Sequence, residues 1–365
     1  MSPSSRRICA VLFLAACVLG LSTASWTGGI AFANPKYAGL VVDVKAGRVL
    51  YSDRADEKRF PASLTKIMTL YILFEEIEAG QLDLNSPLKV SAFAAAQKPT
   101  KLGLKAGQTI SVRDAMRALA VKSANDVAVV VAEAIEGSEE AFARRMTRTA
   151  HSLGMKSTTF KNASGLADPG QVTTAREMAI LGQSVQDRFP QHYKIFESRT
   201  FKWGKRRYSN TNRLLGRVRG VDGIKTGYIR ASGFNLVISV RLTDRHIIAV
   251  VMGGRTGKRR DAHMADLIRR YLKKASSGSR TAPYFIANPQ SGVPLPKERL
   301  SDLALKIAAK SFSTPRPNPL AAYSGGGQTL LPAIDRKIGT LVEATASAPS
   351  TYSIAAPLTG RWNDD

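Results

Sequence analysis

The chain has 365 residues, of which 44% are apolar, and a formal net charge of +25. This composition excludes a fibrous or wholly disordered protein and suffices for one large core or two modest ones. The positive charge favours an anionic partner such as a cell wall, a membrane surface or a nucleic acid. Because no nucleic-acid-binding motif is present, we do not expect a nucleic acid as the partner.

The first residues are typical of an export signal. Arg6 and Arg7 precede an apolar run over 8–21, and residues 31–33 (Ala-Phe-Ala) form a small-x-small cleavage pattern. We therefore expect residues 1–33 to be a signal peptide and the protein to be exported to the periplasm or the cell-wall space. A transmembrane anchor is the weaker alternative, because the run is shorter than the roughly 18 residues that span a bilayer.

Both cysteines lie in this segment. Cys17 follows Leu-Ala-Ala, which also resembles a lipoprotein signal, so lipidation at Cys17 competes with cleavage after Ala33. Cleavage after Ala33 would remove Cys9 and Cys17 together. The mature chain would then have no disulfide, no cysteine nucleophile and no cysteine-bound metal.

Strands are expected at both ends of the region that follows, with helices between them. The stretch after Lys36 alternates apolar and polar residues around Ala46-Gly47, which predicts a β-hairpin. A helix is expected from Ser63 to Ala79, and its stretch IMTLYILF is apolar on nearly every face and so belongs inside a core. Further helices are expected over 111–135, 138–152, 173–186 and 258–274, and further strands in RTFKWGKRRYS, IKTGYI, FNLVISVRL and HIIAVVMGG.

This order predicts a mixed α/β fold of the α+β type, in which an antiparallel sheet from both ends is flanked by helices, with a helical subdomain beside it. We assign residues 34–276 to this domain and expect the catalytic cleft between the sheet and the subdomain. Residues 277–365 hold ten of the chain's 17 prolines. We expect a mostly disordered tail there, with one short helix over 303–309.

Ser63-Leu64-Thr65-Lys66 begins the central helix. A spacing of three residues places the serine hydroxyl and the lysine amine on one face, one turn apart. The backbone N–H at a helix start is free to stabilise an oxyanion, and burial would lower the pKa of Lys66 toward that of a usable base. A lone SxxK is otherwise an ordinary helix start with a capping serine.

Two further polar clusters follow. Ser123 and Asn125 lie between two apolar stretches, where a second hydroxyl can relay a proton and a carboxamide can hold a substrate amide. Lys225-Thr226-Gly227 lies in a predicted strand and suits a terminal carboxylate, with a charge, a donor and an open strand edge. Each cluster alone is a weak signal. In this order, SxxK, SxN and KTG are the signature set of penicillin-binding proteins and serine β-lactamases.

The strings FPASLTKIMT, VKSANDVAVVVAE, NASGLADPGQVTTAREMA, VDGIKTGY and VVMGGRT resemble the D-alanyl-D-alanine carboxypeptidases among low-molecular-mass penicillin-binding proteins. The resemblance covers about residues 36–275. It implies serine-type removal of the terminal D-alanine from peptidoglycan stem pentapeptides, through an acyl-enzyme that β-lactams also form as covalent inhibitors. It implies no metal and no other cofactor.

The resemblance also implies roles for the residues of the first two motifs. Ser63 would be the acylated nucleophile, and Lys66 its general base. Ser123 would relay protons, and Asn125 would hold the substrate amide.

The resemblance implies that the third motif binds the substrate. Lys225 and Thr226 would bind the terminal carboxylate, with Gly227 at the open strand edge, and the backbone N–H groups of Ser63 and Tyr228 would form the oxyanion hole. Arg255 in GGRT is a further candidate for the carboxylate, and the alternative is a surface arginine that follows a strand.

Several alternatives to this function stay open. An endopeptidase that cuts wall cross-links is the nearest one, because cleft walls decide substrate length. A non-catalytic sensor of peptidoglycan or β-lactams is another, although pure binding needs neither Ser63 nor Lys66. A class A β-lactamase, a Ser-His-Asp hydrolase and a zinc peptidase are less expected, because ExxLN, GxSxG and HExxH are absent. The end GRWNDD is not a basic apolar helix, so a membrane surface as partner lacks support.

Overall fold

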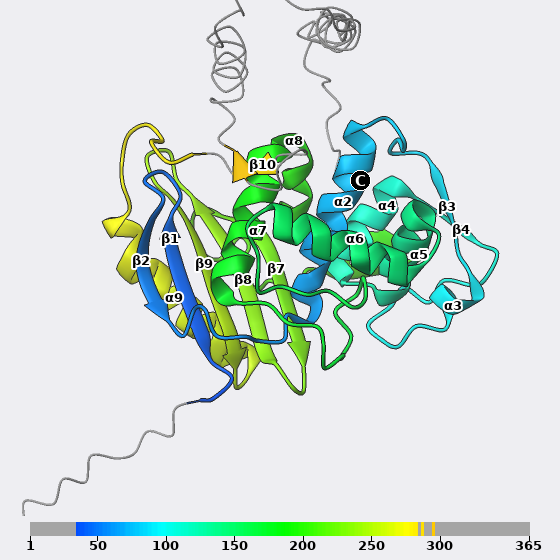
Figure 1. The fold of residues 1–365 in the computed structure, drawn as a ribbon, viewed down its shortest axis with the longest axis horizontal. Helices are drawn as coiled ribbons and strands as arrows, with labels where there is room; N and C mark the ends of the chain where they lie inside the picture. The colour runs from blue at the N-terminus through cyan, green and yellow to red at the C-terminus, as the bar shows by residue number, and fades with distance from the viewer. Residues whose placement is uncertain (1–33, 284–285, 288–293, 296–365) are drawn as a thin grey trace, which may run out of the picture. The chain divides into compact units, whose positions relative to one another are not determined.

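The computed structural model describes residues 34–283, 286–287 and 294–295. The expected signal peptide, both cysteines, the helix expected over 303–309 and most of the expected tail lie outside these residues. No helix of the described part is long and apolar enough to cross a bilayer. Figure 1 shows a sheet with helices on both faces, beside a group of helices.

The sheet is built from both ends of the domain. Its strand order is β2-β1-β9-β8-β7, and every neighbouring pair is antiparallel. The strands are β1 (Ala38–Asp43), β2 (Arg48–Asp53), β7 (Val221–Ile229), β8 (Gly233–Arg241) and β9 (His246–Gly254). Because β1 pairs with β9, the first hairpin joins the three strands from the end of the domain, which confirms the predicted fold class.

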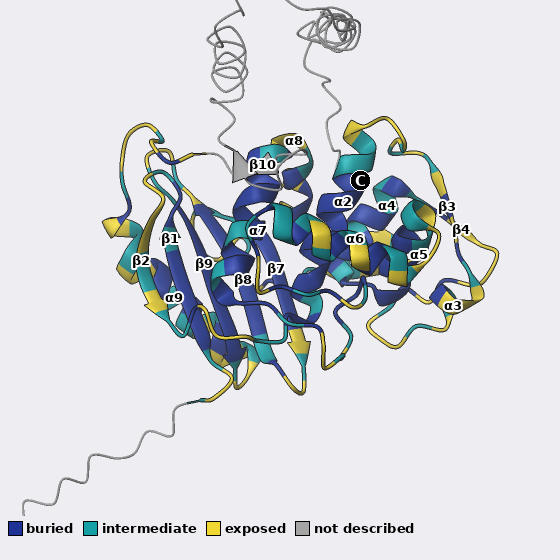
Figure 2. Cartoon of the chain, viewed as in Figure 1, coloured by how far each residue is buried: buried dark blue, intermediate teal, exposed yellow. Residues whose placement is uncertain are grey.

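The central strands are apolar on both faces because helices cover both. On β9, Ile248, Val250 and Met252 belong to the core on the side of α7 (Ala175–Arg188). Ile247, Ala249 and Val251 alternate with them and pack on the side of α9 (Gly257–Tyr271). A strand with a period of two presents one set of side chains to each face, and Figure 2 shows the centre of the sheet as buried.

The helical region surrounds α2 (Lys66–Glu78). Every residue of α2 from Lys66 to Phe74 is buried, as expected for a helix that is apolar on nearly every face. Of the helical elements, η1 (Ala62–Thr65), η2 (Ala118–Lys122), α5 (Asn125–Glu136) and α6 (Glu139–Ser152) pack on α2. The others are α3 (Ala92–Ala95), α4 (Val112–Arg117), α8 (Pro190–Tyr193) and η3 (Lys194–Glu197).

The helix expected over 111–135 is interrupted. The α-helix α4 changes to a π-helical turn, η2, and the chain then breaks before α5. Ser123 has a φ of 61°, a left-handed conformation that a helix cannot continue through. The break separates the two apolar stretches that flank the SxN motif.

Four other predictions hold, three for helices and one for a turn. Helices over 138–152 and 173–186 correspond to α6 and α7, with Thr174 capping α7, and the last helix to α9 and the following turn η4 (Leu272–Lys274). The turn at Trp203-Gly204 joins β5 (Thr200–Trp203) and β6 (Arg206–Ser209). The pair β3 (Pro87–Lys89) and β4 (Thr109–Ser111) and the short helix α3 were not predicted.

Residues just past the predicted boundary at 276 contact the domain. Arg280 pairs with both carboxylate oxygens of Asp187, at 2.6 and 2.9 Å. The backbone N–H groups of Thr281 and Ala282 each donate to the carbonyl oxygen of Lys45 at 2.8 Å. Further on, β10 (Ile286–Ala287) pairs with β11 (Pro294–Leu295). The boundary itself stays a prediction.

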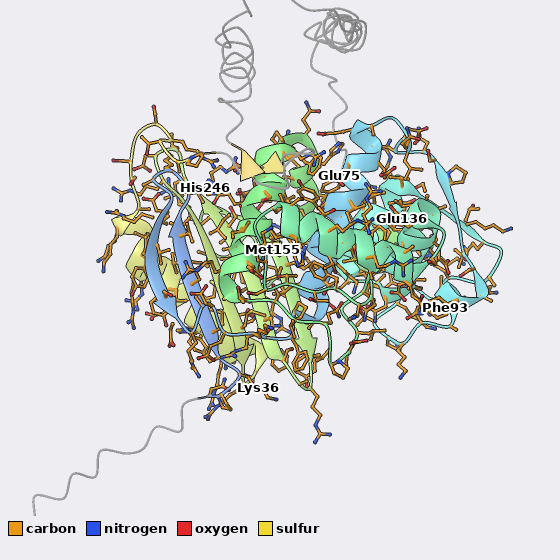
Figure 3. The ribbon with its side chains drawn as sticks, viewed as in Figure 1. Lys36, Glu75, Phe93, Glu136, Met155 and His246 are labelled. Carbon is orange, nitrogen blue, oxygen red and sulfur yellow. The ribbon has the colours of Figure 1, made fainter. Side chains whose placement is uncertain are left out.

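We expect His246 to make the stability of the folded domain depend on pH. It lies at one end of the sheet (Figure 3), with Nε2 3.1 Å from Ser239 Oγ, and burial together with nearby cations lowers its pKa to about 3. The unfolded chain takes up this proton below about pH 6.5 and the folded chain only near pH 3. Stability is therefore lost as the pH falls between these values, by up to about 1.4 kcal/mol per pH unit.

We expect the unfolding temperature of His246→Gln to fall less steeply than that of the wild type between about pH 6.5 and about pH 4. Thermal scans by circular dichroism measure both slopes. The carboxylates that also titrate in this range are the same in both proteins. Equal slopes would therefore contradict the assignment to His246.

Candidate active site

Ser63 lies in the single turn η1, which leads directly into α2. The serine is half-buried, and the backbone around it is tightly packed from two sides. A Cβ added to Gly165 would lie 1.9 Å from the carbonyl oxygen of Ala62, and one added to Gly227 would lie 3.0 Å from the amide nitrogen of Ser63. The two glycines therefore allow a loop and strand β7 to press against the turn that carries the serine.

Lys66 is the first residue of α2 and is fully buried. Its Nζ donates to Asn125 Oδ1 at 2.7 Å and to the carbonyl oxygen of Ser164 at 2.6 Å. Ser63 Oγ lies 3.5 Å from the same Nζ. A neutral amine held by two acceptors keeps its lone pair for the serine hydroxyl, which is the arrangement that a general base requires.

The surroundings lower the pKa of Lys66 well below the usual value for lysine. Burial is the main cause, and the positive charge of Lys225 acts in the same direction. Asp126 and Glu139 oppose the shift. Because burial outweighs the two carboxylates, the amine is available as a base at a pH where an exposed lysine is protonated.

Ser123 and Asn125 lie at the break between η2 and α5. Thr100 Oγ1 donates to the carbonyl oxygen of Ser123 at 2.8 Å, and the N–H of Asn125 donates to the carbonyl oxygen of Thr100 at 2.7 Å. Asn125 Nδ2 also donates to the carbonyl oxygen of Lys98 at 2.9 Å. Within the described residues the buried Oγ of Ser123 has no hydrogen-bond partner. Such a group costs free energy, so it is a candidate for a role in the chemistry.

Lys225 and Thr226 lie on β7, the strand that packs against η1. Lys225 is buried, and burial together with the positive charge of Arg260 lowers its pKa to about 7. Thr226 Oγ1 lies 2.6 Å from Thr211 Oγ1. A buried cation beside a hydroxyl can bind a carboxylate through charge-assisted hydrogen bonds.

The last two candidates are exposed. Tyr228 is 53% exposed and stacks on Phe234 of the neighbouring strand, with ring centroids 4.2 Å apart. Arg255 directly follows β9, and in the described part of the chain no hydrogen bond joins its side chain to Lys225 or Thr226. The structure thus brings together Ser63, Lys66, Asn125, Lys225, Thr226 and Gly227, but it does not tie Arg255 to them.

Sequence reasoning missed several contributions to this arrangement. Asp126 is fully buried and accepts backbone N–H bonds from Leu102, Gly103 and Leu104 at 3.1, 2.9 and 3.2 Å. It thereby fixes the loop whose carbonyl groups hold Asn125. Its position directly after the SxN motif was the available signal.

Asn235 was also missed. Its Nδ2 donates to the carbonyl oxygens of Phe60 and Pro61 at 3.0 and 3.1 Å, and its Oδ1 accepts from the N–H of Gly253 at 3.0 Å. These bonds tie the turn before Ser63 to the middle of the sheet.

The described residues contain no group of three or more His, Cys, Asp or Glu side chains that could hold a metal ion. What they bring together is a serine hydroxyl, a buried amine of lowered pKa, a carboxamide and a strand that carries a second buried lysine. Such a set suits nucleophilic acyl transfer.

Known proteins share this fold. Penicillin-binding protein 5 from Haemophilus influenzae aligns with a TM-score of 0.63 and 32% identity, over 65% of this chain and 70% of that one. Penicillin-binding protein D2 from Listeria monocytogenes, solved in the ampicillin-bound form, aligns with a TM-score of 0.56 and 29% identity, over 64% of this chain and 95% of that one.

Sequence comparison points the same way. D-alanyl-D-alanine carboxypeptidase DacC of Escherichia coli is 38% identical over 228 residues, which are 60% of this chain and 57% of that protein. DacF of Bacillus subtilis is 33% identical over 242 residues, which are 65% of this chain and 62% of that protein. The chain thus spans less than two thirds of the length of these relatives. The family model of the peptidase S11 D-alanyl-D-alanine carboxypeptidases matches residues 35–256. The chain therefore belongs to the D-alanyl-D-alanine carboxypeptidase family, peptidase S11, of the low-molecular-mass penicillin-binding proteins.

Proposed function

We propose that this protein is a serine-type carboxypeptidase that removes the terminal D-alanine from peptidoglycan stem pentapeptides. The observation that carries the proposal is the buried amine of Lys66, 3.5 Å from Ser63 Oγ and held by two acceptors. Family membership supports the reaction class and the substrate class. The export signal expected over residues 1–33 would bring the enzyme to the wall in the periplasm or cell-wall space.

In the acylation step, the neutral amine of Lys66 takes the proton of Ser63. Ser63 Oγ attacks the carbonyl carbon between the two D-alanines, and the backbone N–H groups of Ser63 and Tyr228 stabilise the oxyanion. The amine of the departing D-alanine receives a proton, for which the unpartnered hydroxyl of Ser123 is the proposed relay. Water then hydrolyses the ester and restores Ser63.

The substrate is held from two sides in this proposal. Lys225 and Thr226 bind its terminal carboxylate, and Gly227 leaves the edge of β7 open to the peptide backbone. Asn125 holds the substrate amide, and Arg255 is a further candidate for the carboxylate. β-Lactams would acylate the same serine, because their strained amide places its carbonyl carbon where the scissile one lies.

The test uses the purified protein and its Ser63→Ala variant with a diacetylated tripeptide that ends in Lys-D-Ala-D-Ala. Release of free D-alanine is measured with and without prior penicillin. Trypsin cleavage after Arg59 and Lys66 yields Phe60–Lys66, in which Ser63 is the one serine, so mass spectrometry of this peptide locates the acyl group.

Release that disappears with penicillin and with Ser63→Ala would support the proposal. Penicillin attached to the peptide Phe60–Lys66 without release of D-alanine would instead favour an endopeptidase or a sensor, and a cross-linked stem dimer would separate these two. Neither labelling nor release would overturn the proposal.

Gly165→Ala is expected to slow acylation of Ser63 by penicillin more than about tenfold. The added methyl group would lie 1.9 Å from the carbonyl oxygen of Ala62, and Gly165 has a φ of 83°, so the turn before Ser63 must shift. The acylation rate is measured with a fluorescent penicillin. Gly107→Ala is the matched control, because Gly107 also has a φ of 83° but nothing lies within 4 Å of an added Cβ. Equal losses in both variants would contradict the argument.

A further inference from the structure

Residues 199–219, called the basic segment below, contain eight lysines and arginines and no aspartate or glutamate. All eight of these residues are exposed. None makes an ion pair with a carboxylate of residues 34–283. The eight residues are Arg199, Lys202, Lys205, Arg206, Arg207, Arg213, Arg217 and Arg219.

Three of the five cations of α9 are arranged differently. Arg269 and Arg270 both pair with Asp266, at 2.5 and 2.7 Å, and Arg260 pairs with Asp261 at 2.6 Å. These charges are largely satisfied within the domain. The charges of the basic segment are available to an external anion.

The basic segment touches both sides of the candidate active site. Its hairpin β5–β6 packs on η2, directly before Ser123, where Lys122 Nζ lies 4.9 Å from the ring centroid of Tyr208. After the hairpin, Thr211 contacts Thr226, and Asn212 Nδ2 donates to the carbonyl oxygen of Gly223 on β7 at 3.1 Å. The hairpin and the residues directly after it therefore lie beside the candidate active site.

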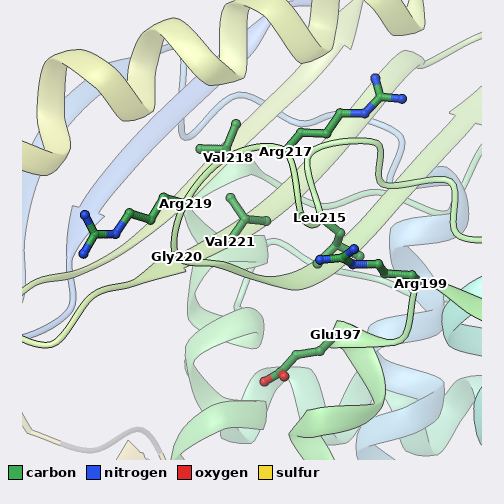
Figure 4. A pocket seen from close by; sticks show the side chains of 9 residues that line it. Glu197, Arg199, Leu215, Arg217, Val218, Arg219, Gly220 and Val221 are labelled. Atoms are coloured by element: carbon green, nitrogen blue, oxygen red, sulfur yellow. The ribbon is translucent and has the colours of Figure 1, made fainter. Parts of the chain in front are cut away.

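The second half of the basic segment forms part of a pocket (Figure 4). Arg199, Arg217 and Arg219 line it together with one carboxylate, that of Glu197. A Cβ added to Gly216 would lie 2.3 Å from the guanidinium carbon of Arg199, so this side chain covers the loop at Gly216. The pocket thus has a positive balance of three cations to one anion.

The loop is fixed in place before any ligand arrives. The N–H of Asn210 donates to the carbonyl oxygen of Arg199 at 2.7 Å, and its Nδ2 donates to that of Ser198 at 2.8 Å. Asn212 Oδ1 accepts from the N–H of Leu214 at 3.1 Å. A preorganised loop loses little conformational freedom when it binds.

We propose that the basic segment binds the carboxylates of stem peptides next to the one that enters the active site, on the same peptidoglycan strand. This inference rests on the proposed function. Each uncross-linked stem ends in a carboxylate, so a wall strand presents carboxylates in series along its length. Guanidinium groups bind carboxylates in a bidentate manner, and several weak contacts on one polymer add up. The enzyme therefore prefers polymeric peptidoglycan to short soluble peptides.

Binding is tested without turnover, in the Ser63→Ala background, by co-sedimentation with insoluble peptidoglycan at low salt. The variant carries Arg199→Gln, Arg217→Gln and Arg219→Gln. The control carries Lys258→Gln, Arg259→Gln and Lys273→Gln, which removes the same charge from exposed residues of α9 and η4. We expect the Kd for peptidoglycan to rise about tenfold in the variant and less than about twofold in the control.

Two further measurements identify the ligand. The first uses peptidoglycan whose carboxylates have been converted to amides. The protein with all three arginines should bind this amidated polymer as weakly as the triple variant binds the unmodified polymer. In the Ser63-containing proteins, release of D-alanine from peptidoglycan should fall in the variant, while kcat/KM for the soluble tripeptide stays within about twofold.

Equal losses in variant and control, or undiminished binding of the amidated polymer, would overturn the inference. A triple variant that no longer binds vesicles of anionic phospholipid, but binds peptidoglycan as before, would overturn the inference in favour of a membrane surface. The proposed function has its own test: it is wrong if the wild type releases no D-alanine from the soluble tripeptide. The co-sedimentation result does not depend on that activity, because it is measured in the Ser63→Ala background.

Discussion

Replacing Lys66 with methionine is expected to slow acylation of Ser63 by penicillin about a thousandfold or more. Methionine fills similar space in the buried position but has no basic nitrogen. Lys66→Arg should be equally slow, because a guanidinium stays protonated and cannot accept the serine proton. The rate is measured by stopped flow with a fluorescent penicillin, and unfolding temperatures show whether both variants fold.

Lys89→Met is the control for loss of a lysine, because Lys89 is exposed on β3. Its acylation rate should equal that of the wild type. A rate for Lys66→Met within tenfold of the wild type would exclude Lys66 as the base. Ser123 would then be the next group to replace.

The pH profile of acylation follows from the pKa of Lys66. Because that pKa is lowered well below its usual value, the acylation rate should rise with pH through the lowered pKa. The rate should reach its plateau at a pH below the one at which an exposed lysine loses its proton. Glu139 opposes the lowering, so Glu139→Gln should move the rising limb to lower pH. Glutamine keeps an oxygen for the N–H of Ala163, which Glu139 Oε1 accepts at 2.9 Å. A limb that moves to higher pH would show that another group titrates.

The parts of the fold that the sequence predicted are those with strong periodicity. IMTLYILF is apolar on nearly every face, and all these residues from Ile67 to Phe74 are buried in α2. β9 is apolar at every position from Ile247 to Met252, as a strand covered on both faces must be. The paired strands β3 and β4 have three residues each, too few for any alternation to be recognised.

The parts of the site that the sequence predicted are side chains within short motifs. Ser63 in η1 and Lys66 at the start of α2 are three residues apart in consecutive helical turns, so local geometry alone brings them together. The carbonyl oxygen of Ser164 is a backbone group 98 positions away from Lys66, and no residue type in the sequence predicts its contact with Lys66 Nζ. Thr211 meets Thr226 only because the loop before β7 folds back along that strand. Such contacts depend on tertiary structure, which motif spacing does not contain.

Removal of the charge of Lys225 is expected to raise the KM for the soluble tripeptide about a hundredfold, with a smaller effect on kcat. Lys225 is 1% exposed, and its pKa is lowered to about 7 by burial and by the nearby Arg260. Lys225→Gln keeps a hydrogen-bond donor but not the charge that attracts the terminal carboxylate. For a peptide whose C-terminus is an amide, the KM of Lys225→Gln should be close to that of the wild type.

The sign of the pH dependence follows from the same shift. In the free enzyme the ammonium of Lys225 is charged below about pH 7 and loses its proton above it, so KM should rise with pH through neutrality. A bound carboxylate stabilises the ammonium, so kcat should change less than KM over this range. Arg260→Gln removes the cation that lowers the pKa of Lys225 and should move the rise in KM to higher pH. A KM that is independent of pH in the wild type, but raised in Lys225→Gln, would mean that Lys225 binds the carboxylate without titrating.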